Sequence, residues 1–391
     1  MKITHIECYV LKGARGTVKG FHSSTGVRNT ILVKTFTDND IYGIGEAFCV
    51  GPDSATLHWV KYFEEQLIGQ DPRRIEYLWA RMYQGARIPP GSSGMAALSA
   101  IEMTLWDILG KSVNSPVYEL LGGQFRDRVR GYDGAGGDSP EQLCEAIQKA
   151  IERGLTAIKT SPLPSNFRSL LWNDALAAAE ERMKIVREKF GYSFDIALDT
   201  HAAIFEPSKT LEIEETVRPY KPLFIEDPIR MENYQAMADL RKKFHVPLAT
   251  GECTFTKWQT GQLISLKAVD IFNPDICLVG GMLELKKIAA NAEGNDLSIA
   301  PHNPMGPVAT MVNIHFAFST PNFVILEHRG PTDIEKNIVI NTPETKEGYF
   351  SLPQGAGWGI DLNMEFLKDY ISNDYWHREE YFLEDGTPAH I

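Results

Sequence analysis

Six side chains suited to acid–base or metal chemistry recur at the ends of short apolar runs between residues 195 and 327. They follow one another at intervals of 23 to 27 residues, about the length of one strand, one helix and two loops. In a parallel barrel, polar groups at the carboxyl end of each strand meet at one face and form the active site. We therefore expect these residues to share the mouth of a barrel: Asp199, Glu226, Glu252, Asp275, His302 and Glu327.

Three of these side chains are carboxylates on successive predicted strands, namely Asp199, Glu226 and Glu252. Three converging carboxylates repel one another unless a cation lies between them. Hard oxygen ligands without a thiolate suit Mg²⁺, with Mn²⁺ as an alternative. Any one of the three could instead cap the following helix or pair with a lysine or arginine. Their regular spacing favours a metal site, and we predict that they hold Mg²⁺.

Two histidines accompany the carboxylates. His201 is two residues after Asp199, so in an extended chain both side chains point the same way. It could be a fourth ligand, a structural residue or a general acid, and its pKa near neutrality favours the acid if protons are transferred. His302 and Asp275 end neighbouring strands, and an adjacent aspartate would fix the histidine tautomer and raise its basicity. The pair is a candidate general base, although His302 alone could be a structural histidine.

Glu327 and Lys159 end two further predicted strands. Glu327 could bind substrate, stabilise an oxyanion if protonated, or form an ion pair with a neighbour such as Arg329. Lys159 could neutralise a substrate carboxylate or pair with a carboxylate of the rim.

Two loops before the barrel could set substrate specificity. Residues 13–27 are rich in glycine, serine and threonine, a composition typical of a lid or of a solvated connector. This loop contains the substrate-binding candidates Arg15 and His22, and a second loop, residues 87–94, contains Arg87.

The elements that must position these groups fall into three parts. Residues 1–125 are predicted to form an α+β domain with three strands and then helices, one of them opened by Asp71 as N-cap and Pro72. Residues 126–330 alternate strand and helix, and residues 331–391 are expected to pack back on the first domain. Eight strands, the number of a closed barrel, are predicted to end at these residues: Tyr132, Lys159, Asp199, Glu226, Glu252, Asp275, His302 and Glu327.

The composition limits the class of function. The formal net charge of −12 argues against nucleic acid or an anionic membrane surface as a partner. The five cysteines are scattered, which indicates neither a disulfide framework nor a zinc site. No secretion signal or transmembrane span is recognisable, so we expect a cytoplasmic protein without a membrane partner.

The ordered set of strand-end motifs resembles the enolase superfamily in its mandelate racemase and muconate lactonizing branch. The resemblance covers nearly the whole chain and implies a (β/α)7β modified TIM barrel with an N-terminal α+β capping domain. The motifs that carry it are Asp199, Glu226-Asp227-Pro228, Gly251-Glu252, Asn273-Pro274-Asp275 with Gly280-Gly281, and Pro301-His302.

Within that branch, the pairing of Asp199 with His201, together with Asp275 and His302, resembles the acid-sugar dehydratases, most closely those of galactonate. The resemblance implies that Mg²⁺ on the three carboxylates binds the carboxylate of an aldonate such as galactonate or gluconate. His302 would remove the α-proton, His201 would protonate the departing 3-hydroxyl, and the product would be a 2-keto-3-deoxy acid. Relatives are commonly homo-oligomers, and we expect the same here.

One departure from the family pattern weighs on the choice of reaction. Many relatives carry Lys-x-Lys on the second strand, where this chain has Lys159-Thr160-Ser161 and lacks the second lysine. This weakens the alternative of an epimerase, racemase or cycloisomerase, which would need His201 as second base or electrophile. A catalytically silent protein is a third reading, and the presence of every proposed metal and proton-transfer residue argues against it.

Overall fold

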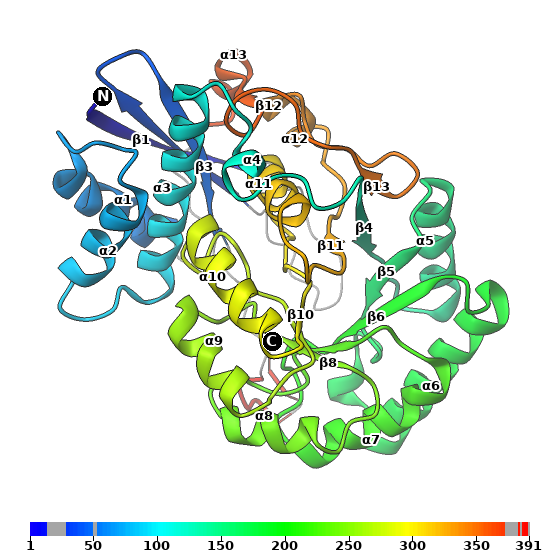
Figure 1. The fold of residues 1–391 in the computed structure, drawn as a ribbon. Coiled ribbons are helices and arrows are strands. Elements are labelled where there is room, and N and C mark those ends of the chain that lie inside the picture. Colours follow the sequence, from blue (N-terminus) through cyan, green and yellow to red (C-terminus); the bar gives the residue numbers. More distant parts are fainter. Residues whose placement is uncertain (14–28, 50–52, 372–381, 384, 390–391) are drawn as a thin grey trace.

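The computed structural model describes residues 1–13, 29–49, 53–371, 382–383 and 385–389. A small N-terminal domain of strands and helices lies beside a large barrel, and the chain after the barrel returns towards that domain (Figure 1). The predicted fold class, a (β/α)7β barrel with an α+β capping domain, is confirmed. Among the described residues, no helix combines the length and the apolar character needed to cross a bilayer.

The capping domain is an antiparallel three-stranded sheet covered by helices. The long helix α3 (Gly91–Ser112) packs directly on strand β3 (Tyr42–Ala47), and a Cβ atom at Gly43 or Gly45 would lie 2.0 or 2.1 Å from a carbonyl oxygen of α3. Only glycine permits this approach, so sheet and helix form one tightly packed core. The remaining elements are β1 (Ile3–Leu11), β2 (Thr30–Thr37), α1 (Asp53–Leu67), α2 (Ile75–Gly85) and α4 (Val117–Leu120).

Two predicted helix boundaries in this domain are wrong. Asp71 does not cap a helix, because its carboxylate binds the side chain and backbone N–H of Arg73, and α2 begins only at Ile75. The glycine- and serine-rich end of the second predicted loop instead forms the first turn of α3, which starts at Gly91. At Asp71 the local contact with Arg73 thus takes the place of a helix cap.

The barrel contains eight parallel strands and the seven helices between them. Strand β11 closes the sheet beside β4, with Glu327 opposite Tyr132, and a bridge from Ile299 to Phe323 joins the β10 side. The strands are β4 (Val129–Gly134), β5 (Ala157–Thr160), β6 (Asp195–Asp199), β7 (Ile225–Glu226), β8 (Leu248–Thr250), β9 (Ile271–Phe272), β10 (Ser298–Ile299) and β11 (Leu326–Glu327). The helices are α5 (Pro140–Glu152), α6 (Trp172–Phe190), α7 (Pro207–Val217), α8 (Tyr234–Arg241), α9 (Thr256–Ser265), α10 (Gly281–Glu293) and α11 (Pro307–Phe318).

A separate buried cluster fills the inside of the barrel. The rings of Tyr132 and Phe224 pack in the same cluster as small side chains from other units of the barrel, so large and small residues together fill the interior. The small partners are Ala157, Ala197, Ala249 and Ala300. This layer packs inside the barrel beneath the carboxyl ends of the strands, which carry the candidate site residues.

The chain after the barrel contacts both the barrel and the capping domain. Strand β13 (Tyr349–Phe350) pairs with the outer start of β4, and Leu11 of the capping domain forms a bridge with Ile371. The indole of Trp358 is fully buried and donates to the carbonyl oxygens of Ile44 and Met103, both in the capping domain. The other short elements are α12 (Glu335–Ile338), β12 (Val339–Ile340), β14 (Asp361–Leu362) and α13 (Met364–Leu367).

Candidate active site

Lys159 stands at the centre of three of the predicted site carboxylates. Its ammonium nitrogen lies 2.9 Å from Glu226, 3.1 Å from Asp199 and 3.1 Å from Glu327. All four side chains are almost completely buried. The ends of β5, β6, β7 and β11 therefore bring one cation and three acidic groups into a single cluster. This cluster of Lys159, Asp199, Glu226 and Glu327 is called the nest below.

The electrostatics of this nest show that one cation does not balance it. Burial alone would lower the pKa of Lys159, but Glu226, Glu327 and Asp199 outweigh it and raise that pKa well above its ordinary value. Burial raises the pKa of Asp199, whereas His201 and Lys159 lower it more strongly, to about 2. Burial and repulsion from Asp199 hold the pKa of Glu226 well above its ordinary value despite Lys159. A further cation would relieve this repulsion.

The donor set fits a hard divalent metal ion. Oε1 of Glu226 is buried and has no hydrogen-bond partner among the described residues, as expected of an oxygen that serves as a ligand. The three predicted ligands are nevertheless not equally close, since Asp199 and Glu226 meet at Lys159 while Glu252 lies nearer His302. Within the part of the chain that the structure describes, the acidic and thiol groups whose ligand atoms lie within 4.8 Å of one another are instead Asp227, Glu252 and Cys253.

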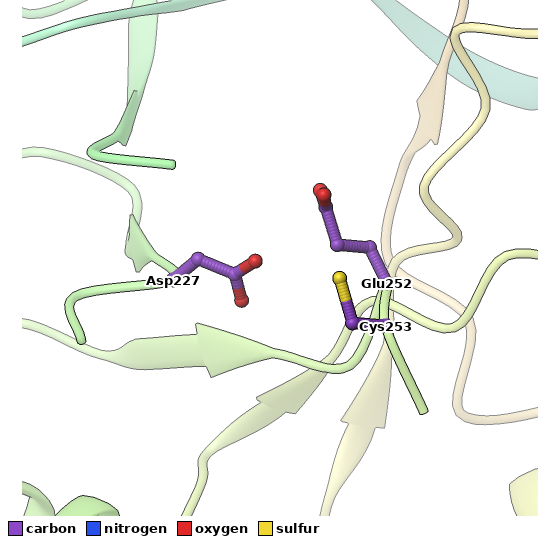
Figure 2. A group of neighbouring side chains, drawn as sticks. All are labelled: Asp227, Glu252 and Cys253. Atoms are coloured by element: carbon purple, nitrogen blue, oxygen red, sulfur yellow. The ribbon is translucent and has the colours of Figure 1, made fainter. Parts of the chain in front are cut away.

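Asp227 and Cys253 are site residues that the sequence reasoning did not select. Figure 2 shows the carboxylate of Asp227 and the side chains of Glu252 and Cys253 directed into the same space. Asp227 is buried, and burial followed by repulsion from Glu252 keeps its pKa well above its ordinary value. Its position directly after Glu226, at the end of a predicted strand, is the sequence signal that could have identified Asp227 as a site residue. Cys253 had none, because a thiol beside Glu252 is not distinguishable from a structural cysteine.

His302 and Asp275 form the predicted pair. Nδ1 of His302 lies 2.8 Å from Oδ2 of Asp275, while the other aspartate oxygen accepts from the backbone N–H of Cys277 at 2.7 Å. Nε2 of His302 lies 3.3 Å from Glu252. Burial would lower the pKa of His302, but Glu252 and the bond to Asp275 prevail and raise it to about 10. The imidazole is thus held by Asp275 with its other nitrogen directed at a proposed metal ligand.

His201 lies beside Asp199 as predicted, but for another reason. Its Nε2 is 3.2 Å from Oδ2 of Asp199, and its backbone N–H donates to Oδ1 at 2.8 Å. The chain is not extended here, because His201 and Ala202 have φ angles of 48° and 51°. A left-handed turn closed by the aspartate carboxylate therefore directs the imidazole to the metal side.

Glu327 is held between two donors. Besides the ion pair with Lys159, it accepts from the backbone N–H of Asn303 at 3.0 Å. Arg329, the alternative partner considered above, forms its ion pair with Glu335. Glu327 therefore belongs to the nest at the mouth of the barrel.

A cavity of about 440 Å³ opens beside these groups. Its lining includes His201, Asp227, Glu252, Arg230, Tyr234 and Ala389, so a residue far beyond the barrel in the sequence contributes to its wall.

Of the three expected specificity residues, the structure describes only Arg87. Arg15 and His22 lie outside the described residues. Arg87 is exposed between α2 and α3 and is not among the described residues that line the cavity.

Comparisons with known proteins agree with this architecture. Residues 6–122 match the family described as mandelate racemase / muconate lactonizing enzyme, N-terminal domain, and residues 142–366 match the enolase C-terminal domain-like family. A D-galactonate dehydratase from Pectobacterium atrosepticum is 32% identical over 372 residues, which cover 92% of this chain and 96% of that protein.

Among the solved structures that match over 100% of both chains are two with bound ligands. An enolase from Agrobacterium radiobacter, provisionally assigned as a galactarate dehydratase and bound to Na and L-malate, is 35% identical with a TM-score of 0.90. An enolase from Pantoea ananatis with bound D-gluconate and Mg is 25% identical with a TM-score of 0.90. From its two matched domains and its full-length relatives, the chain belongs to the mandelate racemase / muconate lactonizing enzyme family of the enolase superfamily.

Proposed function

We propose that this enzyme dehydrates an aldonate, such as galactonate or gluconate, to a 2-keto-3-deoxy acid in a Mg²⁺-dependent reaction. The observation that carries the proposal is the placement of two histidines on opposite strands. His302 follows β10 and His201 follows β6, four strands away in the sheet, and each contacts a carboxylate of the proposed metal site. The names of the similar proteins, which act on galactonate or bind gluconate, support the same substrate class.

Asp199, Glu226 and Glu252 are the proposed Mg²⁺ ligands. When bound, the ion would neutralise the substrate carboxylate and the negative charge that builds up as the α-proton leaves and an enediolate forms. Lys159 already holds a positive charge against two of these ligands and would add to the attraction for the substrate carboxylate. Together the ion and Lys159 would offset most of the negative charge of the site carboxylates where an anionic substrate must bind.

The proton transfers would be divided between the two histidines. His302, oriented by Asp275, would take the proton from C2 of the substrate. Mg²⁺ held by Glu252 would offset the carboxylate charge that raises the pKa of this imidazole, so that the neutral form could accept the proton. His201 would give a proton to the 3-hydroxyl, which leaves as water, and the resulting enol would tautomerise to the 2-keto acid. Glu327, fixed by Lys159 and Asn303, would contact the substrate from the strand between β10 and β4.

An epimerase or cycloisomerase is the second candidate, because His201 could act as a second base rather than as an acid. The residues after Lys159 argue against it. Thr160 and Ser161 are buried where many relatives have another lysine, and Lys159 itself is paired with three carboxylates. Neither the Thr160-Ser161 pair nor the ion-paired Lys159 supplies a neutral amine that could remove a proton from the substrate face opposite His302.

The test is a screen of purified protein with Mg²⁺ against aldonic and aldaric acids, with 2-keto-3-deoxy products detected by semicarbazide. Turnover of an aldonate that is lost in His302→Asn supports the proposal. Exchange of the α-proton with D₂O and an epimerised product, without a keto acid, would instead establish the second candidate. Failure of every acid in a protein that binds Mg²⁺ would refute the dehydratase assignment.

A further inference from the structure

A buried carboxylate of the capping domain caps a helix of the barrel. Glu46, at the end of β3, accepts from the backbone N–H of Gly306 at 2.6 Å and of Ala309 at 3.0 Å, across 260 and 263 residues of chain. These are the N-cap and third positions of α11, whose N-terminal N–H groups have no partner within the helix. A carboxylate there also meets the positive end of the helix dipole. Glu46 is fully buried, so the contact is a fixed joint between the two domains.

The joint lies at the end of the short segment that carries the proposed base. Only Asn303, Pro304 and Met305 separate His302 from Gly306. A Cβ atom at Gly306 would come within 2.6 Å of Glu46 Oε1, which shows how closely the carboxylate approaches the backbone. A shift of this carboxylate would therefore move the segment that holds His302.

Hydrogen bonds make this segment stiff. The side chain of Asn303 donates to Oγ1 of Thr310 in α11 at 3.0 Å and to the carbonyl oxygen of Glu327 at 2.9 Å. Asn313, one turn further along α11, donates to Oδ1 of Asn303 at 3.2 Å. Because these side chains are buried, displacement of α11 would be passed to both His302 and Glu327 rather than absorbed by solvent.

A second carboxylate of the capping domain repeats this arrangement one unit earlier. Glu102 of α3 is fully buried and accepts from the N–H groups of Met282 at 2.8 Å and Leu283 at 2.9 Å, at the start of α10. Helix α10 follows the strand end that carries Asp275, and Figure 1 shows α10 beside the capping domain. The capping domain thus holds the two helices that follow the two members of the His302–Asp275 pair.

We propose that Glu46 is a positioning residue for His302, fixing the general base from the other domain through the N-terminus of α11. This inference rests on the proposed function for its kinetic consequence, but the placement of the imidazole is independent of turnover. It predicts that loss of the carboxylate lowers kcat more than it changes KM. In the proposed function the substrate's carboxylate binds at Mg²⁺ and Lys159, away from α11. Removal of the α-proton depends instead on the position of Nε2 of His302.

The chain provides a matched control. Asp107 is another fully buried carboxylate of the capping domain, and it accepts from the backbone N–H groups of Ile44 at 3.0 Å and Trp358 at 2.9 Å. It joins the capping domain to the C-terminal segment and also forms an ion pair with Lys111 at 2.7 Å. It reaches α11 only indirectly, through the contact of the Trp358 carbonyl oxygen with Nε2 of His315 at 3.1 Å. Glu46→Gln and Asp107→Asn therefore each replace a fully buried carboxylate that accepts two backbone N–H groups, and only Glu46 is bonded directly to the segment that follows His302.

The experiment compares these two variants with the unaltered protein by thermal unfolding, steady-state kinetics and NMR of ¹⁵N-labelled imidazoles, with His302→Asn used to assign the signal. We expect both to lose stability. Glu46→Gln should also lose on the order of 10- to 100-fold in kcat, the cost of a misplacement of about 1 Å, with KM nearly constant. The His302 imidazole signal should shift in Glu46→Gln alone. Glu46→Asp, which keeps the charge, should recover part of kcat.

Equal kcat values in the two variants, or a His302 signal unchanged in Glu46→Gln, would overturn the inference. If Glu46→Gln does not fold, Gly306→Ala replaces it, because the added methyl group presses on the same carboxylate while leaving its charge in place. If the unaltered protein dehydrates no sugar acid, the proposed function fails, and the imidazole signal still decides whether Glu46 positions His302.

Discussion

Replacement of Lys159 by methionine should make the protein dependent on Mg²⁺ for part of its stability. Methionine has a similar volume and no charge, so Asp199, Glu226 and Glu327 would lose a buried ammonium group now 2.9 to 3.1 Å away. Mg²⁺ would then bind without the repulsion of a neighbouring ammonium. The rise in Tm on adding Mg²⁺ should therefore be larger in Lys159→Met than in the unaltered protein.

The size of the effect follows from the burial of the nest. Removing one partner of a buried ion pair costs about 3–5 kcal/mol. An unfolding entropy of about 2.1 cal/mol/K per residue gives about 0.8 kcal/mol/K for 391 residues, so Tm should fall by about 4–6 °C. Mg²⁺ at about 100 times its Kd adds about 2.7 kcal/mol, which corresponds to about 3 °C.

The assay is thermal unfolding of chelator-treated protein over a Mg²⁺ titration. Lys257→Met is the control, because Lys257 pairs with the buried Glu284 at 3.0 Å outside the nest and should lose stability without any change in the Mg²⁺ response. An equal Mg²⁺ response in both variants, or a Lys159→Met protein as stable as the parent without metal, would refute the reasoning.

Three further predictions concern the site and the domain interface. His302→Asn should lower kcat by on the order of 10²- to 10⁴-fold, the usual contribution of a general base, and substantial residual turnover would contradict its role. Exhaustive chelation should abolish turnover and Mg²⁺ should restore it, whereas full activity of the chelated protein would exclude the metal site. Burial, against hydrogen bonds from Leu283 and Met282, raises the pKa of Glu102 from 4.5 to about 7, so the folded state binds this proton more tightly than the unfolded chain. The resulting stability, about 3 kcal/mol, is fully present below about pH 4.5 and is lost as the pH rises through about 7. Glu102→Gln should remove that pH dependence from unfolding measurements, and an unchanged pH profile would contradict the assignment.

The barrel and its strand-end residues could be predicted from the sequence because both depend on local regularity. A strand–helix unit has a nearly fixed length, so an acidic residue at the end of each apolar run marks the same face of the sheet. The turn at His201 was not predictable from alternation, because the Asp199 carboxylate itself bends the chain into a left-handed conformation.

Contacts between distant segments were not accessible from the sequence. The carboxylates of Glu46 and Glu102 look like ordinary acidic residues in a strand and a helix, and their partners lie 180 to 263 residues further along the chain. An ion pair of Lys159 with a rim carboxylate was one of the two alternatives considered from the sequence, but its contact with three carboxylates at once was not predictable. Periodicity shows which face of an element is buried, but not which distant polar group meets it there.

The burial of Trp358 in the capping domain has a consequence for how the chain folds as it is synthesised. The indole closes on Met103, whose carbonyl oxygen accepts its N–H, across 255 residues of chain. At about 5–20 residues per second, roughly 13–50 s pass between translation of these two residues. During that interval the N-terminal domain has been translated but lacks the Trp358 side chain that completes its core. Native packing of the first domain therefore waits for a segment translated 255 residues later, and a nascent chain that stalls inside the barrel exposes apolar surface in that domain.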